Sequence, residues 1–173
     1  MKGPVFLTGL MGSGKTTVGR LLAALLGWDW VDLDRMIEKK SGKKVAQIFR
    51  LQGEAAFRRL ESKELLALSH HKYCVVSCGG GVVLGAENRR LLGRHLTLYL
   101  AAGPGTLARR LQGEQARLRP LLQDQGPRVT LQRLQRERAH FYRVCARFVL
   151  RASDRPEAIA KRAFQRVSST LTP

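Results

Sequence analysis

A short stretch near the start of the chain has the residue types and spacing of a loop that binds nucleotide phosphates. Residues 9–16 read Gly-Leu-Met-Gly-Ser-Gly-Lys-Thr and match the pattern G-x-x-x-x-G-K-[ST]. Its glycines let backbone N–H groups approach phosphate oxygens closely. Lys15 can bring positive charge to the β- and γ-phosphates, and the Thr16 hydroxyl can bind Mg²⁺. The motif predicts a bound nucleotide, but it does not by itself choose a reaction.

The segments on either side of this loop agree with that interpretation. Residues 4–8 form a short apolar, β-prone run, and residues 17–26 have the composition of a helix. A strand that leads through the loop into a helix N-terminus is the context that the motif requires. This context disfavours the alternative, a glycine-rich turn that carries a lysine by coincidence.

Two aspartates follow the next apolar run. Residues 28–33 are predicted to form a second strand, with Asp32 and Asp34 at its C-terminal end, where open α/β sheets bind ligands. Residues two apart on a strand point the same way, so one carboxylate could hold hydrated Mg²⁺ while the other contacts a substrate hydroxyl. Asp34 could equally cap the helix that follows.

The rest of the chain alternates short apolar runs with amphipathic segments, which predicts an α/β fold with helices on both faces of a parallel sheet. The polar segment at residues 113–128 is too long for an ordinary connection and is predicted to be a mobile lid. Further strands are predicted at residues 73–77, 96–101 and 147–151, and helices at 36–52 (interrupted near 41–42), 54–70, 87–93, 106–112, 129–146 and 156–171.

A glycine run and three arginines could contribute to a site. The run at residues 79–81 directly follows the third strand, where a ligand could approach the backbone, although a flexible turn also fits. Arg58 could bind an acidic substrate in bidentate fashion. Arg119, inside the predicted lid, could neutralise charge on a transferring phosphoryl group. Each of these, like Arg138, is also compatible with an ordinary solvated arginine.

Composition limits the partners. The formal net charge of +18 attracts polyanions, but aromatic residues are only 6% and the charge is dispersed, so we expect no specific nucleic-acid binding; incidental RNA binding stays open. No run approaches the roughly 20 apolar residues of a membrane helix, so we expect no membrane association and a cytoplasmic location. Cys74, Cys78 and Cys145 lack metal-ligand spacing and are predicted to be buried thiols.

Taken in order, these motifs resemble the shikimate kinases over nearly the whole chain. The resemblance implies a single domain over residues 1–173, a three-layer α/β sandwich of the P-loop, nucleoside-monophosphate-kinase-like type. It would contain a five-stranded parallel sheet, a lid at about residues 113–128 and an acceptor-binding region at about residues 33–61. The motifs are the loop at 9–16, Asp32-x-Asp34, Gly53-Glu54-x-x-Phe57-Arg58, Gly79-Gly80-Gly81, Arg119-Pro120-Leu121-Leu122 and Arg138-x-x-x-Tyr142.

The resemblance also implies roles around ATP. Lys15 and Arg119 would act on the phosphates, Thr16 would bind Mg²⁺ directly, and Asp32 would reach the metal through water. Arg155 matches a position near adenine. The ATP-binding set implied is Gly12, Ser13, Gly14, Lys15, Thr16, Thr17, Arg119 and Arg155.

On the acceptor side, the resemblance implies that Asp34 binds shikimate hydroxyls and helps to activate the attacking one. Arg58 and Arg138 would bind the carboxylate. Arg117 and Arg136 leave the positions of Arg119 and Arg138 open by two residues. The substrate-binding set implied is Asp34, Arg58, Gly79, Gly80, Gly81 and Arg138.

The implied activity is transfer of the γ-phosphoryl group of MgATP to the 3-hydroxyl of shikimate. We expect the protein to be a monomer. The nearest alternative is another P-loop phosphotransferase, one that acts on gluconate or a nucleoside monophosphate. An alternative of a different class is a basic nucleic-acid-binding protein that uses ATP only as a ligand.

Overall fold

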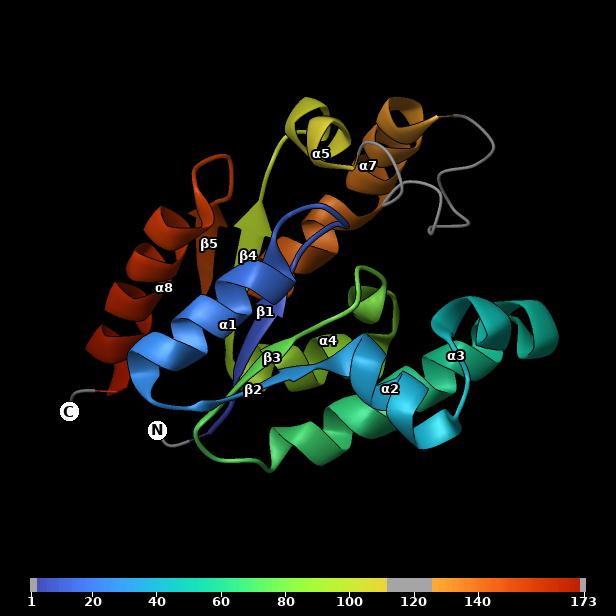
Figure 1. Ribbon diagram of the computed structural model, residues 1–173, viewed down its shortest axis with the longest axis horizontal. Helices are drawn as coiled ribbons and strands as arrows, with labels where there is room; N and C mark the ends of the chain where they lie inside the picture. Colours follow the sequence, from blue (N-terminus) through green and yellow to red (C-terminus); the bar gives the residue numbers. More distant parts are fainter. Residues whose placement is uncertain (1–2, 112–125, 172–173) are drawn as a thin grey trace.

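A parallel sheet forms the centre of the computed structural model, which describes residues 3–111 and 126–171 (Figure 1). The strand order is β2-β3-β1-β4-β5, and every neighbouring pair is parallel. The three central strands are almost entirely buried because helices cover both faces. The predicted α/β fold with a five-stranded parallel sheet is therefore confirmed. The strands are β1 (Val5–Thr8), β2 (Asp29–Asp32), β3 (Cys74–Ser77), β4 (Leu96–Ala101) and β5 (Phe148–Arg151).

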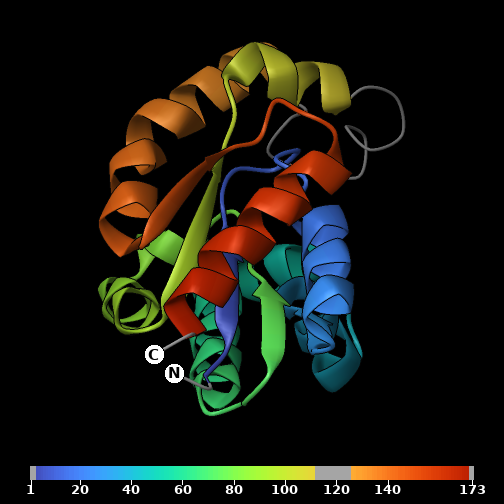
Figure 2. The same cartoon turned by 90° about the vertical axis from the view of Figure 1, so that its left-hand side faces the viewer.

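Two groups of helices cover the sheet. Helices α1 (Lys15–Leu26) and α8 (Pro156–Leu171) pack against each other on one face, which Figure 2 shows from the side. The remaining helices surround the other face and its upper edge. They are α2 (Leu33–Ser41), α3 (Val45–Ser69), the short 3-10 helix η1 (Val82–Leu84), α4 (Ala86–Arg94), α5 (Pro104–Arg110) and α7 (Pro127–Cys145).

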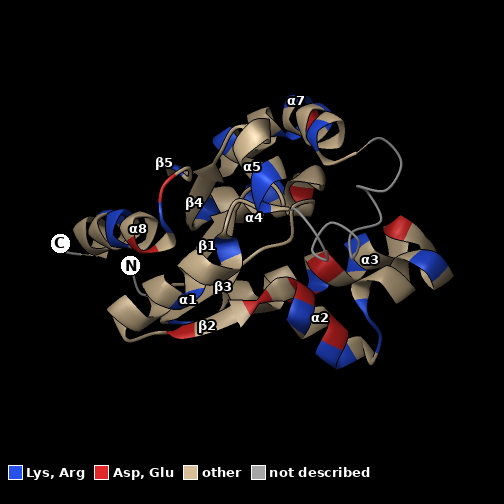
Figure 3. Ribbon diagram, turned by 45° about the horizontal axis from the view of Figure 1, so that its top comes forward, with Lys and Arg blue, Asp and Glu red and all other residues tan. Residues whose placement is uncertain are grey.

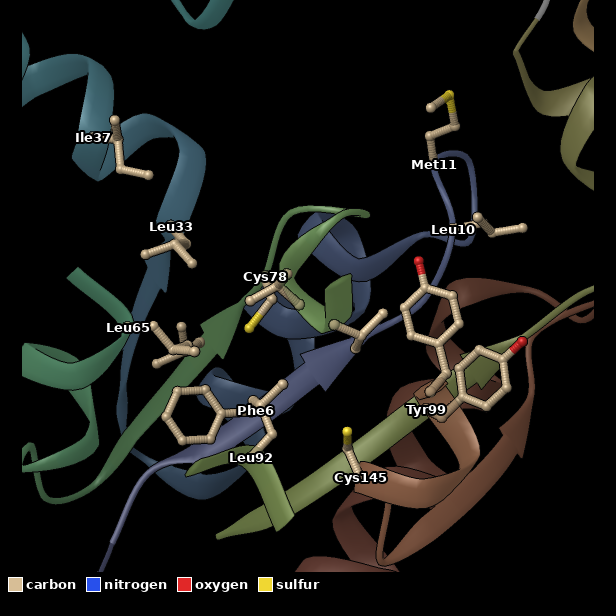
Figure 4. Close-up of a cluster of buried hydrophobic side chains, with 14 of the residues drawn as sticks. Phe6, Leu10, Met11, Leu33, Ile37, Leu65, Cys78, Leu92, Tyr99 and Cys145 are labelled. Atoms are coloured by element: carbon tan, nitrogen blue, oxygen red, sulfur yellow. The ribbon is translucent and has the colours of Figure 1, made fainter. Parts of the chain in front are cut away.

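The hydrophobic core is divided between the two faces because strand side chains alternate in direction. Phe6 of β1 packs into the core beneath α3, α4 and α7, where Figure 4 shows it among Leu65, Cys78 and Leu92. Val5 and Leu7, its neighbours on the same strand, pack beneath α1 and α8. The predicted buried thiols are confirmed at Cys74, Cys78 and Cys145.

Several element boundaries differ from the sequence prediction. Strand β2 ends at Asp32, so Asp34 lies in the first turn of α2 and not on the strand. Asp32 is the N-cap of that helix and accepts a hydrogen bond from the Arg35 backbone N–H at 3.3 Å, so the capping role considered for Asp34 belongs to Asp32. The predicted helices at 36–52 and 54–70 have other bounds in the structure. Helix α2 ends at Ser41, and α3 runs from Val45 to Ser69 across a kink at Gly53, where φ is 79°.

Most of the predicted lid, including Arg119, lies outside the described residues. The last residues of the predicted lid, 126–128, instead form the start of helix α7: Gly126 caps this helix and Pro127 begins it. A proline is favourable at the first position of a helix, where no backbone N–H is needed. Among the described residues, no helix is both long enough and apolar enough to cross a membrane.

Candidate functional site

The phosphate-binding loop connects β1 to the first turn of α1. Gly12 and Gly14 have φ values of 78° and 90°, in the left-handed region that glycine adopts without strain. Lys15 begins α1, and its Nζ atom folds back to donate hydrogen bonds to the carbonyl oxygens of Gly9 at 2.8 Å and Leu10 at 3.0 Å. The ammonium group is thus held against the loop, next to the helix N-terminus, where anions are stabilised.

Two side chains with oxygen atoms that can bind a metal meet beside this loop. The Thr16 hydroxyl donates a hydrogen bond to Asp32 Oδ2 at 3.0 Å, which joins the start of α1 to the end of β2. A hydroxyl and a carboxylate are the hard oxygen ligands that Mg²⁺ prefers, and Mg²⁺ usually takes only one or two protein ligands. The donor chemistry therefore fits the predicted metal site, although the described residues contain no larger cluster of metal-ligating His, Cys, Asp or Glu.

The sequence analysis missed a polar contact that supports this arrangement. Ser77, at the end of β3, donates a hydrogen bond to the Lys15 carbonyl oxygen at 2.9 Å. It accepts one from Trp30 Nε1 at 3.1 Å. A serine and a tryptophan in separate strands carry no sequence signal of this contact, because it depends on β2 and β3 being neighbours.

Two carboxyl groups converge beside the glycine run that follows β3. A Cβ atom at Gly79 would lie 2.7 Å from Asp34 Oδ1 and 2.9 Å from Glu61 Oε1, so only a residue without a side chain fits there. Asp34 comes from α2, and Glu61 comes from α3, where it is fully buried. The sequence analysis missed Glu61 because a glutamate on a charged helix ordinarily faces solvent.

Replacing Gly79 by alanine should displace these two carboxyl groups. We expect the KM for the acceptor substrate to rise at least about tenfold, because a methyl group and the two oxygens cannot occupy the same space. Gly93→Ala is the matched control, since, apart from its chain neighbours and the adjacent backbone of its own helix, no described atom lies within 4 Å of the position that its Cβ would take. Steady-state kinetics of both variants provide the measurement, and equal KM values for Gly79→Ala and Gly93→Ala would contradict the assigned geometry.

Arg58 contacts the carboxyl oxygen of Glu61 that does not face Gly79. Its Nη1 atom contacts Glu61 Oε2 at 2.7 Å, and its Nη2 atom contacts Glu54 Oε1 at 3.0 Å. The guanidinium packs directly against Gly81, where any side chain would overlap it. Arg58 is thus not a solvated helix arginine, because two carboxylates and the glycine run hold it toward the interior.

Burial, aided by the nearby Asp34 charge and opposed by the Arg58 charge, raises the pKa of Glu61 to about 7. The folded protein therefore keeps a proton on Glu61 that the unfolded chain releases at a lower pH. The stabilisation from this proton is fully present below the usual glutamate pKa of about 4.3 and is lost as the pH rises through about 7.

Glu61→Gln should remove this pH dependence because an amide cannot ionise. Between pH 5 and pH 8 we expect the free energy of unfolding of Glu61→Gln to rise by about 3 kcal/mol relative to wild type, since each pH unit between pH 5 and the Glu61 pKa of about 7 corresponds to about 1.4 kcal/mol. Urea unfolding at both pH values measures it. A difference that is the same at pH 5 and pH 8 would contradict the raised pKa.

Helix α7 contributes a further cation to the glycine run. Arg138 is buried, and its Nη1 atom donates a hydrogen bond to the Gly80 carbonyl oxygen at 3.1 Å. Arg136 is exposed to solvent, so the structure brings Arg138 to the glycine run and leaves Arg136 outside. Arg117 and Arg119, the other pair between which the sequence left a choice, both lie outside the described residues.

Arg155 lies in the exposed loop between β5 and α8. The neighbouring Asp154 carbonyl accepts a hydrogen bond from Arg110 Nη2 at 3.1 Å, and Arg110 Nη1 also reaches the Gly12 carbonyl at 3.5 Å. Arg110, at the end of α5, thus connects this loop to the phosphate-binding loop. The other cations are spread over several helices on both sides of the molecule (Figure 3).

Comparisons with known proteins identify relatives of this chain. The shikimate kinase family profile matches residues 11–168. A shikimate kinase of Synechococcus elongatus is 41% identical over 168 residues, covering 96% of this chain and 87% of the relative. The structure of shikimate kinase from Acinetobacter baumannii in complex with shikimate matches with a TM-score of 0.93 and 34% identity, covering 100% of this chain and 97% of that one. A gluconokinase from Sinorhizobium meliloti, 18% identical with a TM-score of 0.57 over 98% of this chain and 95% of its own, shares the fold alone.

Proposed function

We infer the activity from one premise: this chain belongs to the shikimate kinase family. We propose that it transfers the γ-phosphoryl group of ATP to the 3-hydroxyl of shikimate, which gives shikimate 3-phosphate and ADP. The observation that carries the proposal is the convergence of Asp34, Arg58 and Arg138 on the glycine run at residues 79–81, next to the phosphate-binding loop.

The acceptor half of the site suits a carboxylated polyol. Arg138 and Arg58 supply guanidinium groups that bind a carboxylate strongly, in part because such hydrogen bonds are charge-assisted. Asp34 supplies a carboxylate that can accept hydrogen bonds from substrate hydroxyls and orient the attacking one. Side chains at Gly79 and Gly81 would overlap Asp34 and Arg58, so the glycines at these two positions keep both groups in place.

The donor half would position and neutralise the phosphates. Lys15 and the loop backbone would bind the β- and γ-phosphates, with Arg119 as an additional cation. Thr16 would bind Mg²⁺ directly and Asp32 through water; the metal, when bound with ATP, neutralises charge on the phosphate oxygens. Asp34 does not need to be a strong base, because a loose transition state makes little demand for early deprotonation.

A coupled assay of ADP release tests the proposal against its alternatives. Shikimate, gluconate and nucleoside monophosphates would each be offered with MgATP. We expect shikimate alone to support rapid turnover, since two buried or half-buried arginines favour a carboxylated acceptor and Asp34 selects one with correctly placed hydroxyls. Preference for gluconate or a nucleotide would overturn the assignment. The monomeric state and cytoplasmic location expected from the sequence stay predictions.

A further inference from the structure

Tyr142 is a fully buried side chain that the proposed reaction does not use. It lies on α7, and its hydroxyl donates a short hydrogen bond to the Gly80 carbonyl oxygen. Its ring stacks on Tyr99 of β4, with the ring centroids 4.9 Å apart and the planes 18° from parallel. Burial raises the pKa of Tyr142 well above its usual value, so the hydroxyl keeps its proton and remains a donor.

The oxygen that Tyr142 contacts is shared with a residue of the acceptor site. Arg138, one helical turn earlier on α7, donates to the same Gly80 carbonyl at 3.1 Å. A Cβ atom at Gly80 would lie 3.5 Å from the Met11 backbone nitrogen and 3.7 Å from the Gly9 carbonyl oxygen, so Gly80 also packs on the phosphate-binding loop. The Gly80 peptide is thus in contact with both α7 and the phosphate-binding loop.

We propose that Tyr142 is a positioning residue for the acceptor: its hydroxyl fixes the Gly80 carbonyl and thereby sets the orientation in which Arg138 meets the shikimate carboxylate. This inference rests on the proposed function. With Tyr142 in place, the carbonyl has two donors from one helix, and the stacked Tyr99 ring prevents the Tyr142 ring from turning. Without the Tyr142 hydroxyl, Arg138 is the one donor from α7 that still holds the Gly80 carbonyl. Its guanidinium is then less available to the substrate.

Tyr99 offers a matched control within the same ring stack. It is buried like Tyr142, but in the described part of the chain its hydroxyl makes no hydrogen bond. Tyr99→Phe therefore deletes one oxygen from the same part of the core without affecting Gly80. A general loss of packing or stability should appear in both variants, whereas a positioning role should appear only in Tyr142→Phe.

The experiment measures shikimate and ATP binding calorimetrically, together with steady-state kinetics. For Tyr142→Phe we expect the Kd and KM for shikimate to rise about tenfold, with the KM for ATP changed by less than about twofold and the midpoint of thermal unfolding close to that of Tyr99→Phe. Equal effects of the two substitutions on shikimate binding, or equal losses for shikimate and ATP, would overturn the proposal.

A double-mutant cycle with Arg138→Met adds a readout that a merely structural role would not change. If Tyr142 acts through Arg138, the Tyr142→Phe effect on the shikimate Kd should largely disappear once Arg138 is absent. Additive effects would contradict the proposal. A wild-type protein that neither binds nor phosphorylates shikimate would instead refute the proposed function, so the two failures are distinguishable.

Discussion

Replacing Lys15 by methionine should lower kcat for phosphoryl transfer on the order of a thousandfold, with shikimate binding little changed. The Lys15 ammonium is held by the Gly9 and Leu10 carbonyl oxygens at the N-terminus of α1. It is therefore placed where negative charge on the phosphates must be neutralised. Methionine retains much of the length and the apolar part of the side chain but supplies no charge.

A control separates loss of the charge in the phosphate-binding loop from a general loss of positive charge. Lys39→Met removes one positive charge from the exposed surface of α2 and should leave kcat unchanged. Thermal unfolding of Lys15→Met shows whether the loop hydrogen bonds also contribute to stability. Full turnover by Lys15→Met, measured by ADP release, would be inconsistent with a phosphate-binding role for the loop.

Removing the Arg58 guanidinium should weaken shikimate binding about a hundredfold while leaving the Kd for ATP nearly unchanged. Arg58 stands beside Gly81 and, among the described residues, forms its ion pairs with Glu54 and Glu61, neither of which belongs to the phosphate-binding loop. Its loss should thus act on one substrate and not on the other. Arg59→Ala, which truncates the exposed neighbouring arginine on the same helix, is the matched control.

The Glu61 contact complicates a single substitution at Arg58. Arg58→Ala leaves a fully buried carboxyl group without its cation, which destabilises the fold and disturbs Asp34 as well. The double variant Arg58→Met/Glu61→Gln avoids this buried carboxyl group without a partner. If this double variant binds shikimate as tightly as wild type, or loses ATP affinity to the same extent, Arg58 does not bind the acceptor.

The phosphate-binding loop was predictable because it is local in sequence. The phosphate-binding loop, the preceding strand and the following helix are contiguous, so residue types and spacing were sufficient. Arg138 could be named from a resemblance, but its choice over Arg136 needed the structure, in which one is buried and the other exposed.

The contacts of the acceptor half depend on strand order and register, which the sequence pattern does not contain. Asp32 pairs with Ser77 across β2 and β3, and this register brings α2 next to the residues that follow β3. It explains why Asp34 reaches Gly79 from a helix and not, as predicted, from a strand. Glu61 was missed for a related reason, because burial of one carboxylate on a charged helix depends on elements distant in sequence.

Identification of the product is the most direct test of the central claim. Shikimate, ATP and Mg²⁺ would be incubated with the protein, and the product examined by mass spectrometry and phosphorus NMR. The account predicts one new phosphate ester per ADP formed, with phosphorus coupled to the proton on carbon 3 of shikimate. Formation of ADP and inorganic phosphate without a phosphorylated shikimate, or a phosphate on a different hydroxyl, would contradict it.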